Sequence, residues 1–189
     1  MTARDVPHQP AAGGPDTTVV TLIGLMGAGK SRVGRRAAQR LGRAFVDSDE
    51  MVALQAGRPV SEIFATEGEE AFRKLERQAV ADALAVDGAV VSVGGGAVLD
   101  AENVARMRAA GPVLWLYAEP ATLAERLRKS LLRGDRPLLA GGDPLAVLTD
   151  LLARRGAAYR AAATATLETD GLSVEQSAAL LAGWIQEHA

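Results

Sequence analysis

The feature that most constrains this chain is the segment GLMGAGKS at residues 24–31. An apolar run at residues 19–24 leads into it, and a helical pattern over residues 30–41 follows it. A turn of the form G-x-x-x-x-G-K-[ST] between a strand and a helix is the context that identifies a P-loop, whereas an ordinary glycine turn with a chance lysine needs no such flanks. The sequence therefore predicts a site for a nucleoside triphosphate.

The residue types in this segment suit phosphate binding. Glycines let backbone N–H groups curl around phosphate oxygens, and the N-terminus of the following helix adds a favourable dipole. Lys30 is expected to reach the β- and γ-phosphates, and Ser31 to ligate Mg²⁺. A dinucleotide fingerprint G-x-G-x-x-G is absent from the chain, and the guanine-reading motif N-K-x-D cannot occur because Asn103 is the only asparagine.

Short apolar runs alternate with helical patterns along the chain. The runs are rich in β-branched residues and lack polar alternation, which is typical of parallel strands covered on both faces. This alternation predicts right-handed βαβ units and a doubly wound α/β fold. We expect strands at 19–24, 44–47, 89–94 and 112–117, with a weaker candidate at 164–169. We expect helices at 30–41, 49–55, 59–66, 69–85, 101–110, 120–131, 144–161 and 173–186.

The composition of the chain limits the kinds of partner and chemistry that it can have. The net charge of −2 offers no broad basic surface to nucleic acid or to an anionic membrane. The absence of cysteine excludes disulfides, thiolate zinc sites and a thiol nucleophile. Residues 1–17 are polar, rich in proline and glycine, and lack the apolar core of a signal peptide, so they predict a disordered tail. We expect one soluble, cytoplasmic domain over residues 18–189.

Two aspartates stand where the second expected strand ends. The segment VDSDE places Asp47 and Asp49 at the carboxyl edge of the sheet, where ligands of open α/β folds bind. Two carboxylates two residues apart can serve a metal-bound water and a substrate hydroxyl separately. Alternatively, Asp49 is only the N-cap of the helix that begins near Glu50.

A glycine triplet, residues 94–96, follows the third expected strand. Three glycines permit close approach of the backbone to a ligand and donation of N–H groups. The alternative is that the triplet is simply a tight turn between a strand and a helix.

Arginines form a further group of candidates. Arg73 and Arg155 lie on expected helices with apolar neighbours, and Arg133 and Arg136 lie in a loop that contains glycine and proline. A guanidinium binds carboxylate or phosphate through two parallel hydrogen bonds. Each arginine taken alone is also compatible with a surface ion pair, and the stripe on residues 30–41 that includes Arg36 is interpreted as a solvated face. A loop with Arg133 and Arg136 suits a lid that closes over ATP and neutralises phosphoryl charge.

Six segments, in order, resemble those of the shikimate kinase family: GLMGAGKS, DSDE, GRPVSEIFATEGEEAFRKLE, VGGGAV, RPLL and RRGAAY. The likeness extends from about Val19 to Leu181. It implies a P-loop NTPase-like three-layer fold with a five-stranded parallel sheet in the order 2-3-1-4-5. It also implies a substrate-binding segment at about 48–78 and a lid at about 129–141. The implied activity is transfer of the ATP γ-phosphate to the 3-hydroxyl of shikimate, toward chorismate and the aromatic amino acids, by a monomer.

The same resemblance implies roles for single residues. Asp49 would orient or deprotonate the reacting hydroxyl, and Asp47 would hold Mg²⁺ through water beside Ser31. Arg136 would come down from the lid onto the phosphates. The residues implied in catalysis are Lys30, Asp49 and Arg136. The residues implied in nucleotide binding are Gly27, Ala28, Gly29, Lys30, Ser31, Arg32 and Arg136.

The shikimate carboxylate is implied to lie between Arg73 and Arg155, with an N–H from Gly95. Arg155 is chosen over Arg154 because of its spacing to Tyr159. Phe64 and Phe72 would shape the pocket.

Two other functions remain open at the level of sequence. A different small-molecule P-loop kinase, such as a gluconate-type sugar-acid kinase, would share the P-loop and direct its arginines to another acid. A regulatory module that binds ATP without acceptor chemistry would lack a use for Asp49, Arg73 and Arg155.

Overall fold

The computed structural model describes residues 17–131 and 143–189, with side chains for all of these except residues 129–131. Five strands form one sheet in the order β2-β3-β1-β4-β5, and every neighbouring pair is parallel. The order and the α/β class expected from the sequence are confirmed. The strands are β1 (Val20–Ile23), β2 (Phe45–Asp47), β3 (Val90–Ser92), β4 (Val113–Tyr117) and β5 (Ala165–Glu168).

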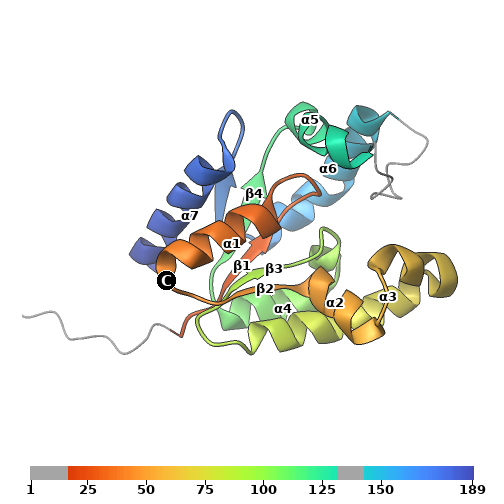
Figure 1. Ribbon diagram of the computed structural model, residues 1–189, viewed down its shortest axis with the longest axis horizontal. Helices are drawn as coiled ribbons and strands as arrows, with labels where there is room; N and C mark the ends of the chain where they lie inside the picture. Colours follow the sequence, from red (N-terminus) through yellow and green to blue (C-terminus); the bar gives the residue numbers. More distant parts are fainter. Residues whose placement is uncertain (1–16, 132–142) are drawn as a thin grey trace, which may run out of the picture.

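Helices cover both faces of this sheet (Figure 1). In the described part of the chain they are α1 (Lys30–Leu41), α2 (Ser48–Ala56), α3 (Val60–Leu84), α4 (Ala101–Ala110), α5 (Pro120–Leu131), α6 (Pro144–Ala162) and α7 (Val174–His188). A short 3₁₀ helix, η1 (Ala97–Leu99), was not expected. Helices α1 and α7 lie side by side on one face of the sheet, and α3 and α4 lie together on the other (Figure 1).

The central strand β1 is buried along its whole length. Helix α1 packs closely over it, because a Cβ at Gly34 would come within 2.7 Å of the side chains of Leu22 and Phe45. The apolar stripe of α1, including Val33 and Ala37, faces this core. The sheet and α1 therefore hold the P-loop between two rigid elements.

The basic stripe of α1 lies on its exposed side. Arg35 pairs with Glu50 at 2.7 Å, and Arg36 and Arg40 both pair with Glu175 at 2.6 and 2.7 Å. Such exposed pairs contribute about 0–1 kcal/mol each. The interpretation of this stripe as a solvated face is confirmed.

A kink at Gly68 divides α3. The sequence predicted two helices, 59–66 and 69–85, and the structure joins them through a glycine with φ 81° and ψ −178°. This backbone conformation is essentially restricted to glycine. The rings of Phe64 and Phe72 pack across the kink with centroids 4.4 Å apart. The two halves of α3 therefore join at Gly68 and also share one buried apolar cluster, which includes Ile63, Phe72 and Ala79.

Some expectations fall on residues that the structure does not describe. The expected tail, residues 1–17, lies outside the described range except for Thr17, whose carbonyl accepts a hydrogen bond from Gly88 N at 2.9 Å. The expected lid, with Arg133 and Arg136, also lies outside it apart from the backbone of residues 129–131. No described helix is both long enough and apolar enough to cross a membrane.

Candidate active site

The P-loop joins β1 to α1 in a conformation that needs glycine. Gly24, Gly27 and Gly29 all have positive φ, at 142°, 82° and 93°, a region that L side chains rarely adopt. Because the N-cap of α1 is Gly29, no capping side chain covers the N–H groups of the first turn. Such groups make a helix N-terminus an anion site. The ammonium of Lys30 donates to the carbonyls of Gly24 and Leu25 at 2.8 and 3.3 Å, so it lies directly over the loop.

Asp47 connects the P-loop to the next strand. Ser31 Oγ donates to Asp47 Oδ2 at 2.6 Å. The other oxygen of Asp47 accepts from the backbone N–H groups of Asp49 and Glu50 at 3.0 and 3.4 Å, which makes Asp47 the N-cap of α2. The alternative that Asp49 is the N-cap is therefore wrong. Asp49 lies in the first turn of α2 and is exposed.

The glycine triplet is the point where the candidate residues converge. A Cβ at Gly94 would lie 2.7 Å from Glu76 Oε1 and 2.8 Å from Asp49 Oδ1, and one at Gly96 would lie 2.6 Å from the guanidinium of Arg73. None of the three glycines has a positive φ. At the outer two positions a Cβ would therefore meet the ends of side chains, which would have to shift, and no positive φ opposes it. The triplet thus has close side-chain contacts that a turn alone does not require, and its role in binding a ligand stays a prediction.

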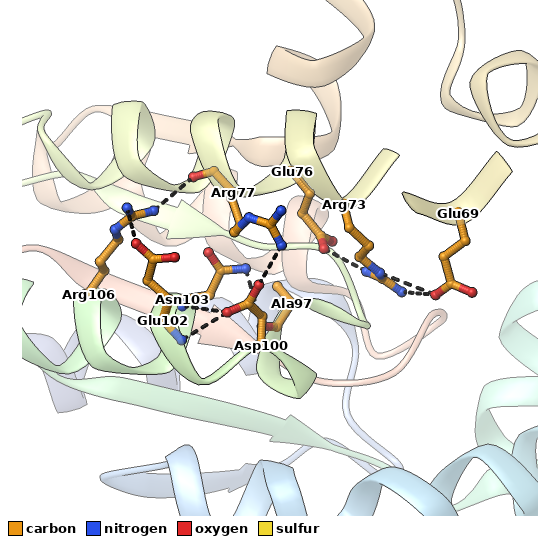
Figure 2. A network of polar contacts seen from close by, with 9 residues as sticks. All are labelled: Glu69, Arg73, Glu76, Arg77, Ala97, Asp100, Glu102, Asn103 and Arg106. Atoms are coloured by element: carbon orange, nitrogen blue, oxygen red, sulfur yellow. Dashed lines mark hydrogen bonds and ion pairs between the residues drawn. The ribbon is translucent and has the colours of Figure 1, made fainter. Parts of the chain in front are cut away.

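Arg73 is held from two sides by carboxylates (Figure 2). Its Nη1 lies 2.6 Å from Glu76 Oε2 and its Nη2 lies 3.0 Å from Glu69 Oε1. Burial lowers the pKa of Arg73, but the hydrogen bonds and charges of Glu76 and Glu69 outweigh burial and raise it. Glu76 is only 1% exposed, and its Oε1 has no hydrogen-bond partner. Burial raises the pKa of Glu76 against the opposing effect of Arg73, and nearby Asp49 raises it further.

Figure 2 also shows a second group of polar contacts beside this one, around Asp100. Arg77, one residue after Glu76, pairs with Asp100 at 3.0 Å. Asp100 in turn N-caps α4 by accepting from the N–H groups of Glu102 and Asn103. The second half of α3 is thereby fixed to the segment that follows the glycine triplet.

Arg155 reaches the triplet from the opposite side, on α6. Its Nη1 donates to the carbonyl of Gly95 at 3.2 Å, and the hydroxyl of Tyr159 donates to the same oxygen. Arg154 points elsewhere, since it is exposed and pairs with Asp150 at 2.9 Å. The choice of Arg155 over Arg154 therefore agrees with the geometry.

The structure brings most of the expected residues to one edge of the sheet. Arg32 lines a surface cavity of about 490 Å³ that begins at Ser31 and extends to Val174 and Glu175. Arg136 lies outside the described residues, so its expected place over the phosphates stays a prediction.

The described residues contain no group of three or more His, Cys, Asp or Glu side chains able to hold a metal ion. Mg²⁺ needs no such group, because it is usually held by one or two carboxylates together with substrate phosphates.

Sequence reasoning missed three residues of this site. Glu76 stands three residues after Arg73 on a helix, the spacing of a helical ion pair, and this spacing could have identified it. Ser48, whose Oγ accepts from Gly94 N at 3.2 Å, lies inside the quoted segment DSDE. Tyr159 was used only as a spacing marker, although a tyrosine in an apolar helical stripe usually finds a partner for its hydroxyl.

Comparison with known proteins identifies the family. The model of the family "Shikimate kinase" matches residues 26–186. The chain belongs to the shikimate kinase family. A shikimate kinase of Symbiobacterium thermophilum is 49% identical over 168 residues, which cover 89% of this chain and 96% of that protein. A shikimate kinase of Neisseria gonorrhoeae is 47% identical over 148 residues, which cover 78% of this chain and 85% of that protein.

Solved structures of shikimate kinases share the fold. One from Acinetobacter baumannii, in complex with shikimate, superposes with a TM-score of 0.84 and 34% identity and covers 90% of this chain and 93% of its own. One from Bacteroides thetaiotaomicron has a TM-score of 0.81 and 29% identity, with 89% and 98% coverage. The predicted activity, that of an ATP-dependent kinase acting on shikimate, is confirmed. The sugar-acid kinase and the regulatory module lose their support.

Proposed function

We propose that this shikimate kinase carries out phosphoryl transfer at the glycine triplet, with the acceptor between α3 and α6 and the nucleotide on the P-loop. One observation carries this assignment. The triplet is in contact with Asp49 and Arg73 on one side and with Arg155 on the other, and Gly95 packs against the P-loop, since its Cβ would lie 3.3 Å from the Gly24 carbonyl. Acceptor and donor sites thus share one short segment of backbone.

The carboxylate of shikimate binds between Arg73 and Arg155, with the N–H of Gly95. The guanidinium of Arg73 is already paired with the carboxyl groups of Glu69 and Glu76. Arg155 has no carboxylate partner within the described residues. Arg155 therefore supplies the positive charge that the substrate carboxylate neutralises, while Arg73 offers a preoriented guanidinium.

Asp49 acts on the 3-hydroxyl. It is exposed at the start of α2 and lies beside Gly94. The hydroxyl oxygen forms a bond to the γ-phosphorus as the bond from that phosphorus to the ADP oxygen breaks, and the hydroxyl proton passes to Asp49. Phosphoryl transfer asks mainly for such alignment and for neutralisation of charge.

Lys30, with Gly27, Ala28 and Gly29, holds the β- and γ-phosphates. Ser31 and Asp47 would hold Mg²⁺, Asp47 through water, since their oxygens lie 2.6 Å apart beside the phosphate cradle. Hard oxygen ligands of this kind fit Mg²⁺, which supplies neutralisation of phosphate charge when bound. Arg32, in the cavity that begins at Ser31, adds a contact to the nucleotide, and Arg136 adds one from the lid.

The same proposal covers the organisation of the chain. Residues 18–189 form one kinase domain, with a substrate-binding segment at about 48–78 and a lid at about 129–141. The enzyme acts as a cytoplasmic monomer without a nucleic-acid partner. The net charge of −2 supports the last point, since it offers no broad basic surface.

Two adjacent arginines provide the test. Arg155→Lys keeps the charge but loses the paired hydrogen bonds, so we expect the KM for shikimate to rise about tenfold or more, with the KM for ATP within about twofold. Arg154→Lys, on the exposed side of the same helix turn, is the matched control and leaves both constants near those of the parent enzyme. Steady-state kinetics with each substrate varied in turn measures this. An unchanged shikimate KM in Arg155→Lys would place the acceptor elsewhere.

A further inference from the structure

Tyr159 is a buried residue whose hydroxyl the proposed chemistry leaves unused. It lies on α6 one helical turn after Arg155, so the two side chains extend from the same face of the helix. Its side chain is fully buried, and its ring stacks on Trp115 of β4 with centroids 5.5 Å apart. Phenylalanine would fill this space equally well. The hydroxyl must therefore be explained by its contact with Gly95.

The Gly95 carbonyl differs from its two neighbours in how it is held. The carbonyls of Gly94 and Gly96 accept from nearby backbone N–H groups, those of Ala97 and Leu99, each at 3.0 Å. The carbonyl of Gly95 accepts instead from two side chains of a remote helix, Arg155 and Tyr159. A carbonyl oxygen has two lone pairs, so both donors can be accommodated at once.

Consecutive glycines give the backbone little steric restraint of its own. A glycine turn that must present one N–H in one direction therefore depends on hydrogen bonds to fix its torsions. Ser48 fixes the N–H of Gly94 at 3.2 Å. At Gly95 the restraint comes from α6.

We propose that Tyr159 is a positioning residue for the acceptor substrate: by holding the Gly95 carbonyl, it fixes the turn so that the Gly95 N–H and the Arg155 guanidinium face the shikimate carboxylate together. The inference rests on the proposed place of that carboxylate. With Tyr159 present, Arg155 needs only one of its N–H groups for Gly95 and keeps the others for the substrate.

The hydroxyl stays a donor under working conditions. Burial raises the pKa of Tyr159 to about 12, against the opposing effect of nearby Arg155. The hydroxyl therefore keeps its proton through the neutral range. The anchored turn also lies against the P-loop, because a Cβ at Gly95 would be 3.8 Å from Met26 N. Tyr159 thus acts on the point where the acceptor site adjoins the phosphate cradle.

Tyr159→Phe removes the donor and keeps the ring. We expect the KM for shikimate to rise about tenfold, with the KM for ATP and the melting temperature close to those of the parent enzyme, because one hydrogen bond is lost and the packing against Trp115 is kept. Tyr117→Phe is the matched control. The ring of Tyr117 also packs on Trp115, with ring centroids 5.2 Å apart. Its hydroxyl, however, donates to Glu119, away from the triplet. This control should leave the shikimate KM within about twofold.

A double-mutant cycle with Arg155→Lys separates positioning from general packing. If both residues act on the same carboxylate, the rise in the shikimate KM of the double variant should be smaller than the product of the two single rises. If the rises in the shikimate KM of the two single variants simply multiply in the double variant, the inference is overturned. It is also overturned if Tyr159→Phe raises the KM for both shikimate and ATP and lowers kcat, because that indicates a structural role.

The remaining outcomes are also decisive. An unchanged KM in Tyr159→Phe together with a raised KM in Arg155→Lys rejects the role of Tyr159 and leaves the proposed acceptor site intact. Unchanged KM values in both variants reject the acceptor site and the inference with it. If Tyr159→Phe does not fold, replacement of Tyr159 by 4-aminophenylalanine keeps a donor in place. Its shikimate KM should then stay within about threefold of the parent value, and a tenfold rise overturns the inference.

Discussion

Ser31 Oγ lies 2.6 Å from Asp47 Oδ2, so the first turn of α1 and the end of β2 are joined beside the phosphate cradle. Asp47 at the same time caps α2, the helix that carries Asp49. One carboxylate therefore links the proposed metal site to the segment that carries the proposed base.

Asp47→Asn separates the role of Asp47 as the N-cap of α2 from its proposed role in the metal site. Asparagine caps helices about as well as aspartate, so the free energy of unfolding should change by less than about 1 kcal/mol. The amide is a poorer partner for Mg²⁺ and its waters, so the Mg²⁺ concentration for half-maximal activity should rise about tenfold. Denaturant unfolding and a Mg²⁺ titration of activity measure the two effects. An unchanged Mg²⁺ requirement would remove Asp47 from the metal site.

Asp49→Asn tests the proposed base. Asparagine keeps the shape of the side chain and loses its ability to take the hydroxyl proton, so kcat should fall about 100-fold or more, with a smaller change in the KM for shikimate. Glu50→Gln is the neighbouring control. Glu50 is exposed and pairs with Arg35 on α1, so its loss should leave kcat within about twofold. Equal effects of the two substitutions would contradict the role of Asp49.

Gly96→Ala tests the close approach of Arg73. The added methyl group would lie 2.6 Å from the guanidinium, which must then move away from its position between Glu69 and Glu76. We expect the shikimate KM to rise about tenfold, with ATP binding retained. Gly183→Ala on α7 is the control, because nothing lies within 4 Å of its added Cβ and alanine favours the helix. A normal shikimate KM in Gly96→Ala would mean that Arg73 does not need its observed place.

Glu76→Gln should change how stability depends on pH. The pKa of Glu76 is raised above its ordinary value of 4.5 by burial and by the charges of Asp49 and Asp100, against the effect of Arg73. The folded protein therefore keeps this proton to a higher pH than the unfolded chain, and the parent enzyme loses stability as pH rises through the raised pKa. Glutamine binds no proton, so the free energy of unfolding of the variant should gain on that of the parent as pH rises above the ordinary glutamate pKa of 4.5.

Urea unfolding of both proteins across this range of pH measures that difference, because groups remote from Glu76 titrate alike in the two. A shift in the opposite direction would show that Arg73 outweighs burial and keeps Glu76 charged. The shikimate KM, measured in parallel at neutral pH, reports whether Arg73 has moved.

Much of this fold could be predicted from the chain alone. The P-loop segment and the alternation of apolar runs with helical patterns give the α/β class, because both depend on local spacing. No local pattern determines the order of the strands in the sheet. The expected order came from the resemblance to shikimate kinases. Local spacing also cannot tell which of two aspartates caps a helix. Asp47 and Asp49 both precede apolar helical positions, and Asp47 is the cap because α2 begins at Ser48 and the N–H groups of Asp49 and Glu50 donate to the Asp47 carboxylate.

Burial of charge was the harder property to predict. A glutamate on an amphipathic helix is ordinarily exposed, yet Glu76 is buried. The reason is tertiary, since the bare backbone of Gly94 admits the carboxylate from one side while Arg73 pairs with it. The glycine triplet and the arginine were both recognised in the sequence, but their contact depends on how α3 crosses the end of β3.

The kink at Gly68 separates two parts of α3 that contribute different residues to the proposed acceptor site. Residues 60–67 carry Phe64, whereas the half that follows the kink carries Arg73 and is tied to α4 through Arg77. The two halves are joined through a backbone conformation that only glycine readily adopts. The earlier half is nevertheless not an independent unit, because its Ile63 is buried in one apolar cluster with Phe72 and Ala79 of the later half. A change of volume in residues 60–67 would therefore be transmitted to the part of the helix that carries Arg73.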